Sequence, residues 1–324
     1  MNRVILGRSG LEVTPIAYGT WQFGGDWGDV DEEQAIRAVR QALDLGINLF
    51  DTAQAYGFGV SERILGRALA DELRSRREDL VIATKGGQSM EGGRLHRDSS
   101  PAFLRRGVEE SLVNLGIDVI DLYKVHWPDP STPFSETAAA LGAMVDEGKI
   151  RHIGVSNFDA AQMAEFSRTR PVETLQPPYH LFDRGIERDV LPYCREHDIG
   201  VLAYGPLAHG LLGGRMTEDT TFPENDWRRN SPLSRSEVLR RDVAIVRELE
   251  HFAAERNATV SQLAIAWVLA NPAVDVAIVG ARQPDHLKES VGAAELKLDA
   301  DDLAQIDRIM EGAVEVAVPP PPSA

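Results

Sequence analysis

Short apolar runs alternate along the chain with longer segments in which apolar residues recur every three or four positions. Most of the short runs are continuous, which is typical of parallel strands covered on both faces. The pattern predicts eight such strands. They span residues 16–18, 47–50, 80–84, 119–125, 152–155, 173–176, 200–204 and 276–279.

The segments between these runs carry residues that start and stop helices. Asp31 is a plausible N-cap for a helix that Gly46 ends. Thr259 and Gln262 have the spacing of a capping box, and Asp299 starts a last amphipathic helix. Eight strand–helix units in series favour a closed (β/α)8 TIM barrel over an open sheet.

A doubly wound dinucleotide-binding fold is the structural alternative, and it requires a G-x-G-x-x-G turn after the first strand. Residues 57–62 have Glu at the third glycine position, and the glycines of residues 24–28 are wrongly spaced. Residues 4–13 predict a hairpin that plugs the bottom of the barrel. We therefore predict one barrel domain with extra helices over residues 1–311, and a disordered proline-rich tail over residues 312–324.

Composition narrows the class of protein. The 34 basic and 50 acidic residues give a net charge of −16, which repels nucleic acid and anionic membranes. A lone cysteine, Cys194, cannot form an internal disulfide, which suits a reducing cytosol. No signal peptide, membrane span or metal site is expected. These features favour a cytoplasmic enzyme, which we expect to be a monomer or a weak homo-oligomer.

Charged and polar residues end three consecutive predicted strands. Asp51 ends the second, Lys85 the third and His126 the fourth, and Tyr56 lies five residues past Asp51. In TIM barrels the chemistry lies at the carboxyl ends of the strands. Because neighbouring strands lie about 4.8 Å apart, the four side chains can converge at one rim.

Together these residue types can provide an acid that works near neutral pH. A free tyrosine has a pKa of about 10, and an adjacent ammonium can lower a tyrosine pKa by roughly 1–3. Asp51 would keep Lys85 charged, and His126 could hydrogen-bond the substrate oxygen. Singly, each residue has a structural reading, as a cap, a solvated strand end, a core histidine or a packed aromatic. Their joint appearance at consecutive strand ends favours a catalytic site.

The chain around these residues resembles the signature of the aldo-keto reductases. The matching segments are residues 47–57, 61–66, 125–127 and 153–158, within a resemblance that runs from about residue 6 to residue 310. It is closest to the bacterial NADPH-dependent branch that includes aryl-alcohol-dehydrogenase-like and inositol-operon-reductase-like members. The resemblance implies Tyr56 as general acid, with Asp51, Lys85 and His126 completing a tetrad.

The same resemblance implies NADPH or NADP⁺ as cofactor. Ser156, Asn157 and Gln176 would bind the nicotinamide carboxamide, Tyr204 would stack on the ring, and Arg282 would meet the 2′-phosphate. The implied cofactor residues are Gly19, Thr20, Trp21, Asp51, Ser156, Asn157, Gln176, Tyr204, Gly205, Pro206, Leu207, Gly210, Leu211, Arg215, Arg228, Gly280, Arg282, His286, Glu289 and Ser290. His286 and Ser290 depart from the usual pattern, where Gln and Asn are common.

The substrate is expected to be a small-molecule carbonyl compound. Trp21, Tyr56, His126 and Trp127 would form its site, and tryptophans in the rim loops indicate an apolar or aromatic pocket. The predicted reaction is reduction of aldehydes, and of some ketones, to alcohols by hydride transfer. Two alternatives remain: a non-enzymatic NADPH-binding regulatory subunit, and a Schiff-base lyase with Lys85 as nucleophile.

Overall fold

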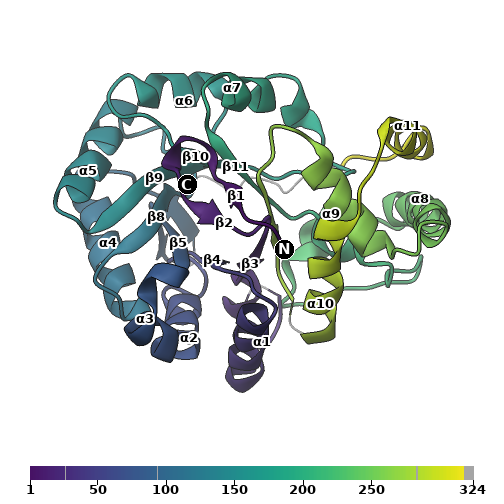
Figure 1. Ribbon diagram of the computed structural model, residues 1–324, viewed down its shortest axis with the longest axis horizontal. Helices are drawn as coiled ribbons and strands as arrows, with labels where there is room; N and C mark the ends of the chain where they lie inside the picture. Colours follow the sequence, from purple (N-terminus) through teal and green to yellow (C-terminus); the bar gives the residue numbers. More distant parts are fainter. Residues whose placement is uncertain (26, 93, 282–283, 317–324) are drawn as a thin grey trace.

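In the computed structural model, eight parallel strands close into a barrel that is ringed by helices (Figure 1). The structure describes residues 1–25, 27–92, 94–281 and 284–316. The barrel strands are β3 (Ile16–Gly19), β4 (Leu49–Asp51), β5 (Val81–Gly86), β8 (Ile120–Val125), β9 (Ile150–Ser156), β10 (Thr174–Gln176), β11 (Gly200–Tyr204) and β12 (Val276–Val279). They pair in that order, and β12 pairs with β3 to close the ring. The predicted TIM barrel is confirmed.

Helices cover the outside of the barrel. They are α1 (Glu32–Asp44), α2 (Val60–Ala68), α3 (Ala70–Ser75), α4 (Pro101–Leu115), α5 (Phe134–Asp146), α6 (Ala160–Ser167), α7 (Val190–Glu196), α8 (Ser236–Ala254), α9 (Val260–Ala270), α10 (Pro284–Gly292) and α11 (Ala300–Ile309). Among the described residues, no helix combines the length and the apolar character that a bilayer crossing requires.

The predicted helix caps are confirmed. The Asp31 side chain accepts a hydrogen bond from the backbone of α1, and Thr259 forms a reciprocal capping box with Gln262 at the start of α9. Asp299 caps α11 in the same way. Each cap satisfies amide groups that have no partner within the helix, so these local signals determine where the helices begin.

The N-terminal hairpin closes one end of the barrel. Its strands are β1 (Val4–Ile5) and β2 (Glu12–Val13), and Leu6 and Val13 are fully buried in the apolar cluster that fills the barrel interior. A Cβ at Gly7 would lie 2.1 Å from the backbone of Gly200, so the hairpin approaches the barrel more closely than any larger residue allows. The predicted plug is confirmed.

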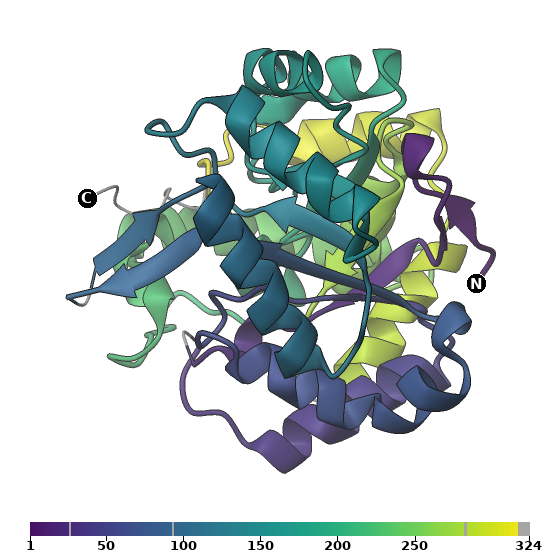
Figure 2. The ribbon, with the colours of Figure 1, turned by 90° about the vertical axis from the view of Figure 1, so that its left-hand side faces the viewer.

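A second hairpin, which the sequence analysis did not anticipate, stands at the opposite end of the barrel (Figure 2). It consists of β6 (Gln88–Glu91) and β7 (Arg94–Arg97), which follow β5 directly and pair antiparallel. Gly92 lies in its turn with a φ of +56°. This hairpin forms one wall above the carboxyl ends of the strands.

The long connection after β11, residues 205–235, is ordered by three short 3-10 helices: η5 (Ala208–Gly213), η6 (Trp227–Asn230) and η7 (Pro232–Ser234). A β-bridge between Trp27 and Asp226 ties it to the loop that follows β3. We call residues 205–235 the strap, because it reaches across the carboxyl ends of the strands.

Residues 312–316, which we predicted as the start of a disordered tail, are ordered. Val316 is buried, and its amide donates a hydrogen bond to the carbonyl of Phe182 at 2.9 Å. The Val314 amide donates to Asp242 at 3.1 Å. Residues 312–316 are therefore packed against the barrel, because their apolar side chains and amides find partners there. Residues 317–324 lie outside the described part of the chain.

Candidate active site

Asp51, Tyr56, Lys85 and His126 meet at the carboxyl end of the barrel. The Lys85 Nζ donates a hydrogen bond to Asp51 Oδ1 at 2.5 Å and another to the Tyr56 hydroxyl at 3.2 Å. The ring centroids of Tyr56 and His126 are 5.7 Å apart, edge to face. The structure thus places the ammonium between the carboxylate and the phenol.

The loop that carries Tyr56 is held by tight backbone contacts. The Tyr56 amide donates to the carbonyl of Ala53, and the Tyr56 carbonyl accepts from Ser61 at the start of α2. A Cβ at Gly24 would lie 2.9 Å from the Tyr56 Cα, so the loop after β3 packs directly on this turn. Tyr56 therefore reaches the rim from a rigid turn.

Burial and mutual attraction control the charges at the site. Burial raises the pKa of Asp51, but Lys124 and Lys85 lower it to about 2. Burial lowers the pKa of Lys85, and Asp51 opposes that effect. Burial and the Lys85 ammonium hold the pKa of His126 well below its usual range. At neutral pH His126 is therefore a neutral imidazole, which can donate one hydrogen bond without carrying charge.

Lys124, which the sequence analysis did not single out, also contacts the tetrad. It lies in β8, is fully buried, and its Nζ donates to Asp51 Oδ2 at 2.6 Å. A signal was present in the sequence. Lys124 lies two positions before His126, and a strand's period of two directs such residues to the same face.

The residues implied at the nicotinamide form one hydrogen-bonded network. Ser156 Oγ donates to the carbonyl of Gln176 at 2.8 Å, and the Tyr204 hydroxyl donates to Asn157 Oδ1 at 2.9 Å. Gln176 Nε2 donates to Asp51 Oδ2 at 2.9 Å. The network joins β9, β10 and β11 to the tetrad, so this strip of the rim is preorganised.

A cavity of about 1050 Å³ runs across this rim. Most of the implied cofactor and substrate residues line it: Gly19, Thr20, Trp21, Asp51, Tyr56, His126, Trp127, Ser156, Asn157, Gln176, Tyr204, Gly205, Pro206, Leu207, Gly210, Arg215, Arg228, Gly280, His286, Glu289 and Ser290. Residues that we did not anticipate line it too, including Gln88, Met90 and Leu95 of the second hairpin and His209 of the strap.

Three implied residues stand apart from this lining. The side chain of Leu211 packs in the core between barrel and helices and does not line the cavity. Lys85 lies beneath the cavity floor, where it contacts Tyr56 and Asp51. Arg282 lies outside the described residues.

The guanidinium of Arg228 is paired within the protein, unlike that of an arginine whose hydrogen-bond donors are all available to a phosphate. Its guanidinium makes two hydrogen bonds to the Asp226 carboxylate, the shorter of 2.6 Å, and one to the carbonyl of His209 at 3.1 Å. The same group lies 4.8 Å from the ring centroid of Trp27. The Asp226 carboxylate neutralises the charge of Arg228. Because Arg228 also binds the His209 carbonyl, it joins two parts of the strap in addition to lining the cavity.

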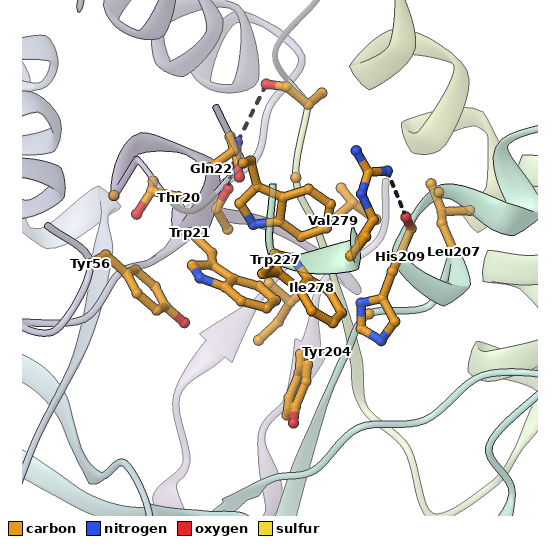
Figure 3. Close-up of a pocket in the computed structure, with 18 of the residues that line it drawn as sticks. Thr20, Trp21, Gln22, Tyr56, Tyr204, Leu207, His209, Trp227, Ile278 and Val279 are labelled. Carbon is orange, nitrogen blue, oxygen red and sulfur yellow. Dashed lines mark hydrogen bonds between the residues drawn. The ribbon is translucent and has the colours of Figure 1, made fainter. Parts of the chain in front are cut away.

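A cluster of tryptophans joins the strap to the catalytic rim. Trp21 and Trp227 stack with ring centroids 5.5 Å apart, and Trp27 meets both edge to face. Figure 3 shows Trp21 and Trp227 side by side in the pocket, with Tyr56 beyond one and His209 beyond the other. The apolar part of the cavity is therefore built from rings that come from two distant segments of the chain.

The family model for the aldo/keto reductase family matches residues 15–311 of the chain. The chain belongs to the aldo/keto reductase family. Asp51, Lys85 and His126 lie at the carboxyl ends of β4, β5 and β8. The match to the family model is a separate observation, and it shows that the chain is a member of this family.

Relatives in the family cover nearly the whole chain. The aldo-keto reductase YhdN of Bacillus subtilis is 41% identical over 314 residues, which are 96% of this chain and 94% of that protein. The NADH-specific methylglyoxal reductase of Escherichia coli is 36% identical over 97% of this chain and its own full length. The solved glycerol dehydrogenase AKR11B4 of Gluconobacter oxydans is 40% identical, with a TM-score of 0.86 over 97% of this chain and 96% of that one.

The cavity of this aldo/keto reductase fits a nicotinamide dinucleotide. Gly19 and Gly280 leave bare backbone at the floor, where a Cβ would lie 2.7 Å from Ile278 and Gln22 respectively. The Nε2 atom of His209 is buried and has no hydrogen-bond partner among the described residues. Helix α10 begins beside the cavity, and a helix N-terminus favours phosphate.

Proposed function

We propose that this aldo/keto reductase uses NADPH to reduce aldehydes, and some ketones, to alcohols, with Tyr56 as the general acid. One observation carries the proposal. The Lys85 ammonium contacts the Tyr56 hydroxyl at 3.2 Å while Asp51 holds that ammonium at 2.5 Å. A phenol in this position can release its proton, because the adjacent positive charge stabilises the phenolate.

The proton transfer follows from these positions. The Tyr56 hydroxyl donates its proton to the carbonyl oxygen of the substrate, and Lys85 stabilises the phenolate that remains. The neutral His126 ring stands edge to face with Tyr56 and hydrogen-bonds the same oxygen, which fixes its approach. The bound cofactor supplies the hydride that reduces the carbonyl carbon.

The remaining residues position the reactants. Ser156, Asn157 and Gln176 would hold the carboxamide of the nicotinamide, and Tyr204 would stack on the ring. The strap, with Trp227, would cover the cofactor together with Trp21 and Trp27 of the loop after β3, which excludes water from the reacting atoms.

NADPH is the proposed cofactor because the sequence carries an arginine, Arg282, three positions after the end of β12 and two positions before the start of α10. A guanidinium next to a helix N-terminus is a suitable partner for the 2′-phosphate that distinguishes NADPH from NADH. One relative is named as NADH-specific. The preference therefore has to be measured for this chain.

The walls of the cavity favour apolar aldehydes. Trp21 stacks on Tyr56 with ring centroids 6.3 Å apart, and Trp127, with Met90 and Leu95 of the second hairpin, also lines the cavity. Removing apolar surface from water is favourable by about 25 cal/mol per Å², before the entropic costs of association are counted, so aldehydes with an aliphatic or aromatic body should have the lowest KM.

The Schiff-base alternative fits the geometry less well. Lys85 is fully buried, its ammonium is bound by Asp51 and by the carbonyl of Thr52, and it lies under the cavity floor. A lyase nucleophile must be neutral and must reach the substrate carbonyl.

The test is an assay of the purified protein with NADPH or NADH against apolar aldehydes, small polar aldehydes, ketones and sugars. We expect cofactor oxidation with apolar aldehydes and a higher kcat/KM for NADPH. Tight NADPH binding without turnover on any carbonyl would favour the regulatory subunit instead. Trapping of a substrate on Lys85 by borohydride would favour the lyase.

A further inference from the structure

Two lysines from neighbouring strands bind the two oxygens of one buried carboxylate. Lys85 in β5 and Lys124 in β8 are direct partners in the parallel register, and both are fully buried. Lys85 Nζ donates to Asp51 Oδ1 at 2.5 Å, and Lys124 Nζ donates to Asp51 Oδ2 at 2.6 Å. Two ammonium groups therefore share one negative charge.

The barrel makes specific room for Lys124. A Cβ at Gly154, its partner in β9, would lie 2.8 Å from the Lys124 Cγ and 2.3 Å from the Thr174 hydroxyl. The chain has only five lysines among its 34 basic residues, and it places two of them here. A buried cation is costly unless it is paired, and a second one beside the first is more so.

The titratable groups that face Lys85 and Lys124 come from several elements packed around the two lysines. Asp51 supplies one negative charge, and the neutral His126 ring and the Tyr204 ring line the cavity on the other side. Glu62 of α2 attracts Lys85 from behind the strand, although burial raises its own pKa. With Asp51 ionised and both lysines charged, these three side chains together carry a net charge of +1.

We propose that Lys124 is a positioning residue of the catalytic site, whose ammonium neutralises Asp51 so that the positive charge of Lys85 acts fully on the Tyr56 hydroxyl. With Lys85 alone, Asp51 would cancel most of that charge. With Lys124 present, the phenolate of Tyr56 gains a net cationic neighbourhood. This inference rests on the proposed function, because it concerns the acid that the function assigns to Tyr56.

Lys124 is itself charged in the range where the enzyme would work. Burial lowers its pKa to about 8, with Lys85 adding to that effect and Asp51 opposing it. At pH 7 most Lys124 side chains are therefore protonated. The contribution of Lys124 to Tyr56 should be present at neutral pH and decline above pH 8.

The test uses alcohol oxidation with NADP⁺, in which Tyr56 must accept a proton and the rate rises with pH. Lys124→Gln keeps a donor for Asp51 but removes the charge, and Lys124→Met removes both. In both variants we expect the inflexion of the kcat profile to move up by roughly 0.5–1.5 pH units, as one unit charge at this range requires. Leu122→Met, two residues earlier in β8 and also inside the barrel, is the matched control and should keep the wild-type inflexion.

The outcomes separate the two proposals. If the wild type turns over no alcohol or aldehyde, the proposed function is wrong. If the wild type is active and both Lys124 variants keep its inflexion while losing only stability or kcat, Lys124 is merely structural.

If the Lys124 variants do not fold, a measurement on the wild type still tests the proposal. The lysine side chains, labelled with ¹³C at Cε, give few signals, and arginine replacement of Lys149, Lys288 and Lys297 identifies the buried pair. A charged Lys124 at pH 7 supports the proposal, and a neutral one overturns it.

Discussion

At the residue scale, Asp51 connects more of the site than its place in the tetrad implies. Its carboxylate accepts hydrogen bonds from Lys85, Lys124 and Gln176, which come from β5, β8 and β10. Replacing Asp51 would leave two buried ammonium groups unpaired, which is strongly destabilising. Tyr56 is therefore the cleaner position at which to test the chemistry, because its hydroxyl faces the cavity.

Tyr56→Phe should lower kcat for aldehyde reduction by about 10²–10⁴-fold, the usual contribution of a general acid. The dissociation constant of NADPH should stay nearly unchanged, because the ring that lines the cavity is retained. Steady-state kinetics and fluorescence titration of the cofactor measure the two quantities.

The matched control is Tyr193→Phe in α7. Tyr193 stacks on His197, whose carbonyl binds Arg8 of the N-terminal hairpin at the closed end of the barrel. The Tyr193→Phe variant should keep wild-type activity. A Tyr56→Phe variant with more than about a tenth of wild-type kcat would mean that another group is the acid.

Cofactor choice is a second question at this scale. Arg282→Ala should weaken NADPH by roughly 10- to 150-fold, because a charge-assisted hydrogen bond is worth about 1.5–3 kcal/mol. NADH has no 2′-phosphate and should bind as before. Arg215→Ala is the control, since a contact to the pyrophosphate would weaken both cofactors alike. Equal losses of NADPH and NADH in Arg282→Ala would rule out its role as reader of the 2′-phosphate.

At the element scale, the strap and the loop after β3 act together. The bridge between Trp27 and Asp226 joins them, and Trp21 and Trp227 stack across the junction at 5.5 Å. Neither segment is a helix or strand of the barrel, so their order depends on each other. An element of this kind belongs to the less stable part of a fold and can open without unfolding the barrel.

Trp227→Ala should speed cofactor release by roughly 2- to 12-fold, because an aromatic pair is worth about 0.5–1.5 kcal/mol beyond the area it buries. Stopped-flow fluorescence of the nicotinamide measures the rate. Trp127→Ala is the control, since Trp127 lines the cavity but packs against Arg97 rather than the strap. It should raise the KM for aldehydes and leave release unchanged. An unchanged release rate in Trp227→Ala would show that the strap does not retain the cofactor.

At the scale of the whole molecule, stability should depend on pH through Asp242. This residue of α8 is fully buried, and Oδ1 accepts the Val314 amide while Oδ2 has no partner in the described structure. Burial raises its pKa from 3.8 to about 6. Between these values the folded state holds a proton that the unfolded state has lost, so stability falls as pH rises through that window.

Asp242→Asn should therefore stabilise the protein at pH 7, by about 1 kcal/mol after allowance for nearby solvent. The gain should be much smaller near pH 4, where the folded-state carboxyl is protonated and the unfolded-state carboxyl is about half protonated. Urea unfolding at the two pH values measures the difference. Asp219→Asn, on the exposed part of the strap, is the control and should change little at either pH. An equal effect of Asp242→Asn at both values would contradict the burial argument.

The sequence by itself determined the order of the barrel strands, the helix caps and the positions of the four tetrad residues. These features are local. A continuous apolar run predicts a buried strand, Asp299 with Asp302 caps α11, and a polar residue at a strand end reaches the rim of any TIM barrel. The hairpin at residues 4–13 was equally readable, because its apolar positions flank a glycine turn.

Only the tertiary structure decided which of these residues touch. Lys124 contacts Asp51 because β8 pairs with β5 in one register, and a slip of one residue would turn its side chain to the outer face. The attachment of the strap to the loop after β3 depends on Trp27 and Asp226, which are almost two hundred positions apart in the chain. Contacts between distant segments follow from barrel closure and packing, which no local pattern encodes.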